Sequence, residues 1–468
     1  MGRLIRKELL GYLLDFRFVA IFLLSVLLSV LSVDVGVKNY GHRLEQQRVV
    51  SSANKARLAT ALEKGGGRGV WDLTRQGIIW NREPETLSPV VFGMSGKLGS
   101  EVHIQYPYPP SYEDSLFSVD PIHALFGILD FSFIVKVILS LCVLLLTYDT
   151  VCGEKESGTF RLTASFPVSR SSLALSKLAS ATIGGLVPLL FSFLLVSSIL
   201  ALSDDLDLSS SDWVRMLATM AVFGLYLLVF ISFGLLLSAV THRRMTAFLA
   251  LMGLWTVWVF IVPNLGLRIA QSVEPVASAY ELKRQSHALR WETNLARNRE
   301  QSAYWELNKV ANWDSISASE QQRLRDGERE IRDKWDTDYA GRIGGLFANR
   351  RNQLRAQQHI LTVLSAISPL GAVSHTTMDL ARTGLIQQEQ IEDAANAYST
   401  YLARYIQRKR AAHWENRQMG DFSWFSFKYM DTVGDCLVRN AFFILNLVML
   451  SILGFVGAYV GILRYDVR

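Results

Sequence analysis

The chain has 468 residues, of which 50% are hydrophobic and 19% are charged, and its formal net charge is +6. A fully soluble protein usually carries about 25% charged residues, so this composition favours a membrane protein with sizeable water-exposed parts. The excess of positive charge calls for no nucleic acid partner, because much of it flanks apolar runs, where it sets membrane orientation.

Six apolar runs are long enough to cross a bilayer, which takes about 20 residues as a helix. A basic segment, residues 1–17, precedes the first run. The pattern predicts an all-α polytopic membrane protein. Its six transmembrane helices are expected at residues 18–37, 125–148, 178–202, 213–240, 245–262 and 440–463.

The short segments between the runs predict the orientation, because cytoplasmic flanks are rich in Lys and Arg. Basic residues occupy both termini, the loop after the second run and the link Thr241–Arg244, whereas the link at 203–212 has four Asp and no Lys or Arg. Both termini are therefore predicted in the cytoplasm. The two long connections, residues 38–121 and 264–439, are predicted on the extracytoplasmic side.

The first long connection begins with a polar stretch of helical character, Asn39–Lys64, which the glycines at 65–67 should end. Short segments rich in Gly and Pro follow, and Pro excludes a long helix there. We expect a small irregular cap that ends near Pro121, in which short strands are one option.

The loop at 149–177 is polar and basic, and it is long enough to hold a short helix along the membrane face. It contains the compact acidic turn Gly153–Thr159. A membrane protein that receives force from a soluble motor needs a segment of this kind.

The second long connection predicts an antiparallel helical stalk. Two long charged stretches, 281–312 and 320–367, carry apolar residues at helical spacing, and Ser317 with Glu320 forms a capping pattern. Gly341, Gly344 and Gly345 suggest a weak point, and a further helix is expected at 385–415. The charged faces favour solvated helices, with a ligand-binding surface as the alternative. The apolar stretch 360–373 is too short to span and should pack on the membrane surface or the stalk base.

Catalytic signatures are absent from the sequence. It holds no phosphate-binding loop, no paired His or Cys at metal-ligand spacing and no nucleophile elbow. Lys136 is the one basic residue well inside a predicted span. Intramembrane charge is costly and often functional, but a span beginning near Phe131 would let Lys136 reach the outer surface. Both interpretations remain open, and Lys136 is a candidate for the substrate path.

The layout resembles the membrane permease subunits of ABC-2 type transporters. Members of that family have an amphipathic elbow helix, here residues 1–17, ahead of six spans. Their acidic turn after span two is similar to residues 153–162, and a Pro and basic residues follow it, here Pro167, Arg170 and Lys177. The long connections resemble the subgroup with a large extracytoplasmic insertion between spans five and six.

The resemblance implies that two permease chains pair, as a homodimer or heterodimer, above two separate ABC ATPase subunits. Those subunits hold ATP and Mg, while this chain binds no cofactor, contributes no metal ligands and is not an enzyme. The loop would form a coupling helix seated in a groove of the ATPase. The implied coupling residues are Glu154, Lys155, Glu156, Gly158, Thr159 and Arg161.

In this interpretation Glu154 and Glu156 pair with basic groups of the ATPase, Gly158 allows a tight turn and Thr159 caps the next helix. The resemblance implies a bacterial cytoplasmic (inner) membrane and an exporter rather than an importer. The insertion at 264–439 would gate the exit, accept substrate or dock a periplasmic partner.

Two other classes compete with the transporter. A membrane-anchored stalk would signal or transmit force without moving a substrate. A secondary transporter would need several charges near the bilayer midplane or paired broken helices, and the sequence offers only Lys136.

Overall fold

The computed structural model describes residues 2–63, 66–96, 99, 101–113, 130–160, 169–309, 313, 316–411 and 419–464. Six of its helices are long and apolar enough to cross a membrane. The prediction of an all-α polytopic membrane protein is confirmed. These candidate spans are Phe16–Thr60, Phe131–Glu156, Arg170–Ala201, Ser210–Val240, Arg244–Val273 and Ala441–Leu463.

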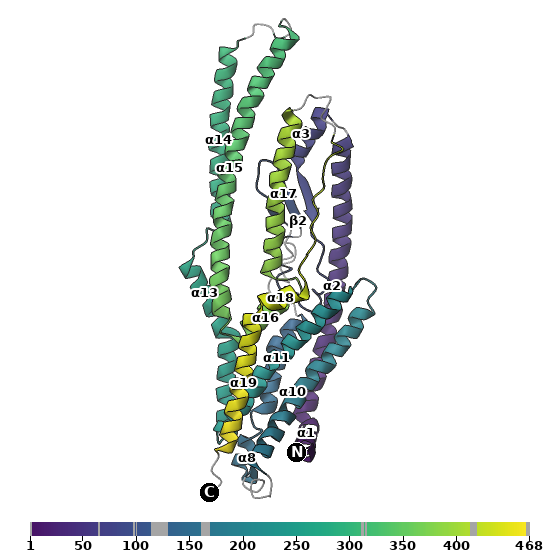
Figure 1. Cartoon of the computed structure of the whole chain (residues 1–468), viewed down its shortest axis with the longest axis vertical. Coiled ribbons are helices and arrows are strands. Elements are labelled where there is room, and N and C mark those ends of the chain that lie inside the picture. Colours follow the sequence, from purple (N-terminus) through teal and green to yellow (C-terminus); the bar gives the residue numbers. More distant parts are fainter. Residues whose placement is uncertain are drawn as a thin grey trace.

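The molecule is elongated, with the spans at one end and a helical superstructure at the other (Figure 1). Both described chain ends lie at the membrane end of the molecule, as an even number of spans requires. The elements of this part are α1 (Gly2–Leu13), α2 (Phe16–Glu63), α6 (Phe131–Phe133), η1 (Ile134–Leu139), α7 (Ser140–Thr147), α8 (Cys152–Glu156), α10 (Arg170–Ala201), α11 (Ser210–Val240), α12 (Arg244–Thr256), η2 (Val257–Ile261), α13 (Val262–Val273) and α19 (Ala441–Leu463).

Helix α11 forms the centre of the bundle and packs against α7, α10 and α19. It begins with a capping box, in which Ser209 and Asp212 exchange side-chain and backbone hydrogen bonds. Phe223, Tyr226 and Phe230 on this helix are fully buried. In a bilayer-embedded bundle, van der Waals packing rather than water exclusion holds the helices together, and these buried rings provide such contacts.

The first five residues of the predicted span two, 125–129, lie outside the described residues. The first described helical residue of this span is Phe131, which follows the N-cap Asp130. The helix then continues as a π-helical segment, η1. Span five also contains a π-helical segment, η2. π-helical segments in membrane helices are common at functional sites.

The polar stretch predicted at 39–64 is helical, but it is not a helix of its own. Span one and the predicted stretch 39–64 form one continuous helix, α2. After it come α3 (Gly66–Gln76) and a three-stranded antiparallel sheet in the order β1 (Ile78–Asn81), β2 (Glu101–Ile104) and β3 (Ser111–Glu113). The register pairs Ile78 with Ile104 and Glu101 with Glu113.

The second long connection holds α14 (Ala279–Leu307), α15 (Ala318–Ser365), α16 (Pro369–Leu380), α17 (Leu385–Ala411) and α18 (Val433–Arg439). Helices α14 and α15 form the expected antiparallel hairpin, with Ser317 capping α15 at Glu320. The weak point expected at Gly341, Gly344 and Gly345 is wrong, because α15 runs through all three without a break.

The two insertions share one core rather than forming separate domains. Helix α17, from the second insertion, packs on α3 and β2 from the first. Leu73, Ile104, Tyr405 and Ile406 are buried together there. Figure 1 shows this mixed body beside the upper half of α2, with the α14–α15 hairpin rising alongside it.

Candidate functional site

The acidic turn after span two is folded tightly onto the bundle. Helix α8 starts at Cys152, and the backbone N–H groups of Val151 and Cys152 both donate to the Ser238 hydroxyl, at 3.0 and 3.1 Å. Free N–H groups at a helix start need an acceptor. Because that acceptor comes from α11, the turn is fixed to the end of span four.

Glu154 makes an ion pair within its own chain. Its Oε1 lies 2.6 Å from the Lys177 ammonium, which also lies 3.3 Å from Glu8 Oε2. The Lys177 side chain is only 1% exposed. A buried ammonium is costly without carboxylate partners, so the three residues join α1, α8 and α10 into one unit.

Glu156 and Lys155 connect the turn to the link between spans four and five. The Glu156 carboxylate accepts a hydrogen bond from the Arg244 backbone N–H at 2.8 Å, and the Arg244 guanidinium donates to the Gly153 carbonyl at 3.3 Å. The Lys155 ammonium donates to the Ala239 carbonyl. Every charged residue of the turn therefore makes a contact within its own chain.

The end of the turn has the geometry that its glycine predicts. Gly158 has a φ of +77°, in the left-handed region that favours glycine. The Thr159 hydroxyl donates back to the Glu154 carbonyl at 3.4 Å. The helix that Thr159 was expected to cap, and Arg161, lie outside the described residues. Phe160 is buried against Leu173 of α10 and Ile462 of α19.

A short exposed ridge remains on the turn. Four consecutive residues are exposed to solvent: Glu156, Ser157, Gly158 and Thr159. The residues on either side of them are buried or half-buried. We name residues 156–159 the ridge. A protein that docks on the turn would meet the ridge first, and Glu154 would be the group behind it.

Tyr12 closes the same region from the side of α1. Its hydroxyl is hydrogen bonded to the Thr150 hydroxyl, and burial raises the pKa of this phenol above its ordinary value. The Arg17 guanidinium lies 2.9 Å from Asp149. The sequence had marked the basic elbow, but it gave no signal that Glu8, Tyr12, Ser238 and Arg244 meet the turn.

Lys136 lies in the π-helical segment of span two. Its ammonium donates to the Ser374 hydroxyl of α16 at 3.4 Å, and its carbonyl accepts a hydrogen bond from Tyr226 at 2.7 Å. The Asp130 carboxylate accepts the backbone N–H groups of Phe92 and Phe133 at 2.8 and 2.7 Å. Among the described residues no ion pair joins Asp130 to Lys136.

The stretch at 360–373 forms the end of α15, a turn at 366–368 and the start of α16. The Ala366 carbonyl accepts a hydrogen bond from Asn446, and the Ser368 hydroxyl donates to the Trp258 carbonyl at 2.5 Å. Asn446 lies five residues into α19, about 8 Å at 1.5 Å per residue. The turn at the base of α15 is therefore held against α19 and η2.

A polar junction joins the bundle to the superstructure at the other end of α11. Arg215 is fully buried and donates to the Leu380 carbonyl at 3.2 Å and to the Asp431 carbonyl. Arg439 lies 2.7 Å from the Asp431 carboxylate and 3.4 Å from that of Asp379. The Arg439 hydrogen bond lowers the pKa of Asp431 below its ordinary value of 3.8.

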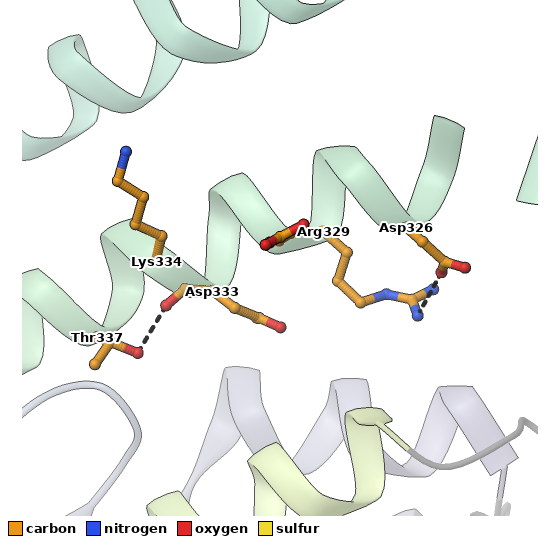
Figure 2. A pocket seen from close by; sticks show the side chains of 6 residues that line it. Asp326, Arg329, Asp333, Lys334 and Thr337 are labelled. Carbon is orange, nitrogen blue, oxygen red and sulfur yellow. Dashed lines mark hydrogen bonds and ion pairs between the residues drawn. The ribbon is translucent and has the colours of Figure 1, made fainter. Parts of the chain in front are cut away.

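The α14–α15 hairpin presents charged, solvated faces. One depression of about 730 Å³ is lined by Asp326, Arg329, Asp333, Lys334 and their neighbours. Figure 2 shows these side chains along α15, with Arg329 paired to Asp326 at 3.1 Å. All of its lining comes from one helix, so it agrees with the solvated-face interpretation. In the parts of the chain that the structure describes, no three His, Cys, Asp or Glu side chains gather at a metal site.

Comparison with known proteins gives one match. The family model described as "ABC-2 family transporter protein" matches residues 4–416, which include five of the six spans and the turn at 152–160. A search of curated proteins found no match. Since the matched region covers most of the chain, this multi-pass membrane protein belongs to the ABC-2 family of transporter proteins and is a membrane permease subunit.

Proposed function

We propose that this chain is the permease subunit of an ATP-binding-cassette exporter in the bacterial cytoplasmic membrane. It works as a dimer with a second permease chain, and two separate ATPase subunits hold ATP and Mg. Family membership carries the proposal. The basic segments at the end that holds both described chain ends support a cytoplasmic location for that end, with the superstructure extracytoplasmic.

The turn at 152–160 is the proposed motor-coupling element. The ridge at 156–159 docks in the ATPase groove, while Glu154 and Lys155 act from behind it. Because the turn is bonded to Lys177 of α10, Ser238 of α11 and Arg244 of α12, a push on the ridge moves the inner ends of three spans together. Arg161 belongs to the same proposal by its place in the motif.

Lys136 is the proposed charge on the substrate path. Its ammonium has a neutral hydroxyl partner on helix α16, so movement of α16 would expose or cover it. Lys136→Arg should then keep substrate-stimulated ATPase activity and Lys136→Gln should lose it. Equal stimulation in both variants would remove Lys136 from the path. The far tip of the α14–α15 hairpin is the proposed docking place for a periplasmic partner.

The decisive experiment is co-purification of the chain with candidate ATPase subunits, followed by ATPase assays. Ser157→Arg places a bulky charge on the ridge and should weaken ATPase binding by about tenfold, or about 1.4 kcal/mol. Ser211→Arg is the matched control, because Ser211 is exposed at the opposite end of the spans.

Two results would count against the proposal. If Ser157→Arg binds the ATPase as wild type does, the ridge is not the interface. If no ATPase subunit binds the wild-type chain, the permease interpretation of its function fails. A membrane-anchored stalk that transmits force without transport would then be the interpretation to test.

A further inference from the structure

A polar cavity of about 250 Å³ lies where the elbow helix α1 meets the bundle. Lys7 and Tyr12 of α1 line one side, and Asp15 and Arg17 line the corner between α1 and α2. Asp149 and Glu154 form the opposite wall, and Leu145 and Leu146 of span two contribute its apolar part. Its volume is below the roughly 300 Å³ at which pockets for drug-sized ligands begin.

Most charges around this cavity are already neutralised. Arg17 pairs with Asp149 at 2.9 Å, and Lys177 pairs with both Glu8 and Glu154. Two lining charges remain. Among the described residues no ion pair is formed by the Lys7 ammonium or by the Asp15 carboxylate. Lys7 and Asp15, both exposed, are therefore available to a ligand, and the Lys177 ammonium shared by two carboxylates leaves one further negative charge at the wall.

Within the described parts of the chain, only one oxygen of the Asp15 carboxylate is used in a structural hydrogen bond. Its Oδ1 accepts the Arg17 backbone N–H at 2.9 Å at the start of α2. Oδ2 remains to accept another donor. Asn can make the same capping contact as Asp, so charge and capping can be separated by substitution.

The surroundings of the cavity are those of a lipid-facing surface. Phe16, beside Asp15, is 82% exposed, and Val19 and Leu23 on the same helix are exposed too. Leu145 and Leu146 belong to a candidate span. A phospholipid whose chains lie along this surface brings its headgroup to the cavity, and the bilayer supplies that headgroup at high local concentration.

We propose that the cavity binds the phosphoethanolamine headgroup of a phospholipid. The phosphate lies beside Lys7 and the Arg17 guanidinium, and the primary ammonium donates to Asp15. A choline headgroup has no N–H to donate, and a glycerol headgroup leaves the Asp15 charge uncompensated. The site thus selects phosphatidylethanolamine over phosphatidylcholine and phosphatidylglycerol.

This inference goes beyond the proposed transport function and does not depend on it. Glu154, the inward residue of the coupling turn, forms part of the cavity wall, and Tyr12 joins α1 to Thr150. A bound headgroup would hold the elbow against the turn. Lipid composition would then influence how firmly the turn is seated.

The test is native mass spectrometry of the full chain released from nanodiscs that contain equal amounts of the three phospholipids. Wild type should retain phosphatidylethanolamine in preference to the other two. Asp15→Asn should lower that preference over phosphatidylglycerol by about tenfold, the effect of one lost charge-assisted hydrogen bond. Lys7→Gln should lower retention of all three. Arg3→Gln is the matched control, since Arg3 is exposed on α1 outside the cavity.

Three outcomes would overturn the proposal. Wild type would retain the three lipids equally, Asp15→Asn would keep the wild-type preference, or soluble glycerophosphoethanolamine would displace the bound lipid at equal concentration. The last result would assign the site to a free headgroup compound rather than to a lipid. Asp15→Glu should restore the preference, which excludes a folding defect as the cause of its loss.

Discussion

Lys177 shows how a charge at the membrane surface can hold three helices together. Its ammonium is buried, and its two carboxylate partners come from α1 and α8, far from it in sequence. From the sequence, Glu154 was recognisable only as part of an acidic turn, and Glu8 only as an acidic residue in the basic elbow. The contact itself could not be predicted, because no local pattern records which long-range charges meet.

Removing both carboxylate partners of Lys177 should lower the free energy of unfolding far more than removing either one. Glu154→Ala leaves Lys177 with Glu8 and should cost about 1–2 kcal/mol, whereas Glu8→Ala with Glu154→Ala strands a buried charge and should cost about 3–5 kcal/mol. The measurement is the thermal unfolding midpoint in detergent. Glu45→Ala, an exposed site on α2, is the control. If the double variant lost only the sum of two small single-variant effects, water would be the partner of Lys177 and the prediction would be wrong.

Asp431 should make stability depend on pH in one direction. Its hydrogen bond from Arg439 lowers its folded pKa below 3.8, so the contribution is present above the unfolded pKa and is lost as pH falls through the folded value. Asp431→Asn should therefore destabilise the protein at pH 7, and this effect should shrink as the pH falls below 3.8. Unfolding midpoints across this pH range provide the measurement, and a difference that persists at low pH would contradict it.

At the scale of elements, the turn between α15 and α16 shows what hydropathy can and cannot predict. A run of 14 apolar residues is too short to span, and the structure has no candidate span there. The neighbours of the turn, Asn446 of α19 and Trp258 of η2, could not be predicted from the run. Predictions from composition locate a helix end but not the neighbours that satisfy its backbone groups.

Two glycines should respond in opposite ways to the same substitution. A Cβ on Gly371 would overlap the Ser365 carbonyl oxygen, so Gly371→Ala must push α16 away from the turn. It should cost about 1–3 kcal/mol, as overpacking typically does. Gly341 has nothing within 4 Å of such a Cβ, so Gly341→Ala should stabilise α15 by about 0.5–1 kcal/mol.

Unfolding midpoints of the two variants, measured side by side, check this expectation. A stabilising Gly371→Ala would mean that the turn is looser than its contacts indicate. A destabilising Gly341→Ala would mean that α15 bends at the glycines, as the sequence had suggested.

At the scale of the whole molecule, the six spans and the α14–α15 hairpin were predictable, and the shared core of the two insertions was not. Long apolar runs and basic flanks are local properties, so the sequence located the spans and indicated the membrane orientation. The shared core of the two insertions depends on contacts such as Leu73 with Ile406, more than three hundred residues apart. Sequence patterns treat such segments as separate domains.

The α14–α15 hairpin should be removable above its contacts with the body. Arg410 lies 3.1 Å from Asp333, Arg355 lies 2.8 Å from Asp393, and the Tyr339 ring packs on that of Tyr108. On α15, all of these contacts are made by residues after 332, on the side of the body. Replacement of residues 301–332 by a short Gly-Ser linker should leave the unfolding midpoint within about 4 °C of wild type.

Size-exclusion chromatography and thermal unfolding of the shortened chain give the answer. Loss of the monodisperse species would show that the tip supports folding. A stable chain that binds the ATPase but has lost function would place the partner-binding role at the tip.

Helix α2 runs from Phe16 to Glu63 without a Pro, about 72 Å at 1.5 Å per residue. It is one continuous helix from the elbow to the distant sheet. A tilt of about 5° at its membrane end displaces its far end by about 6 Å over that length. In the proposed coupling, small rotations of the lower end of α2 would therefore become larger displacements of the outer body, and no flexible linker would be needed to transmit them.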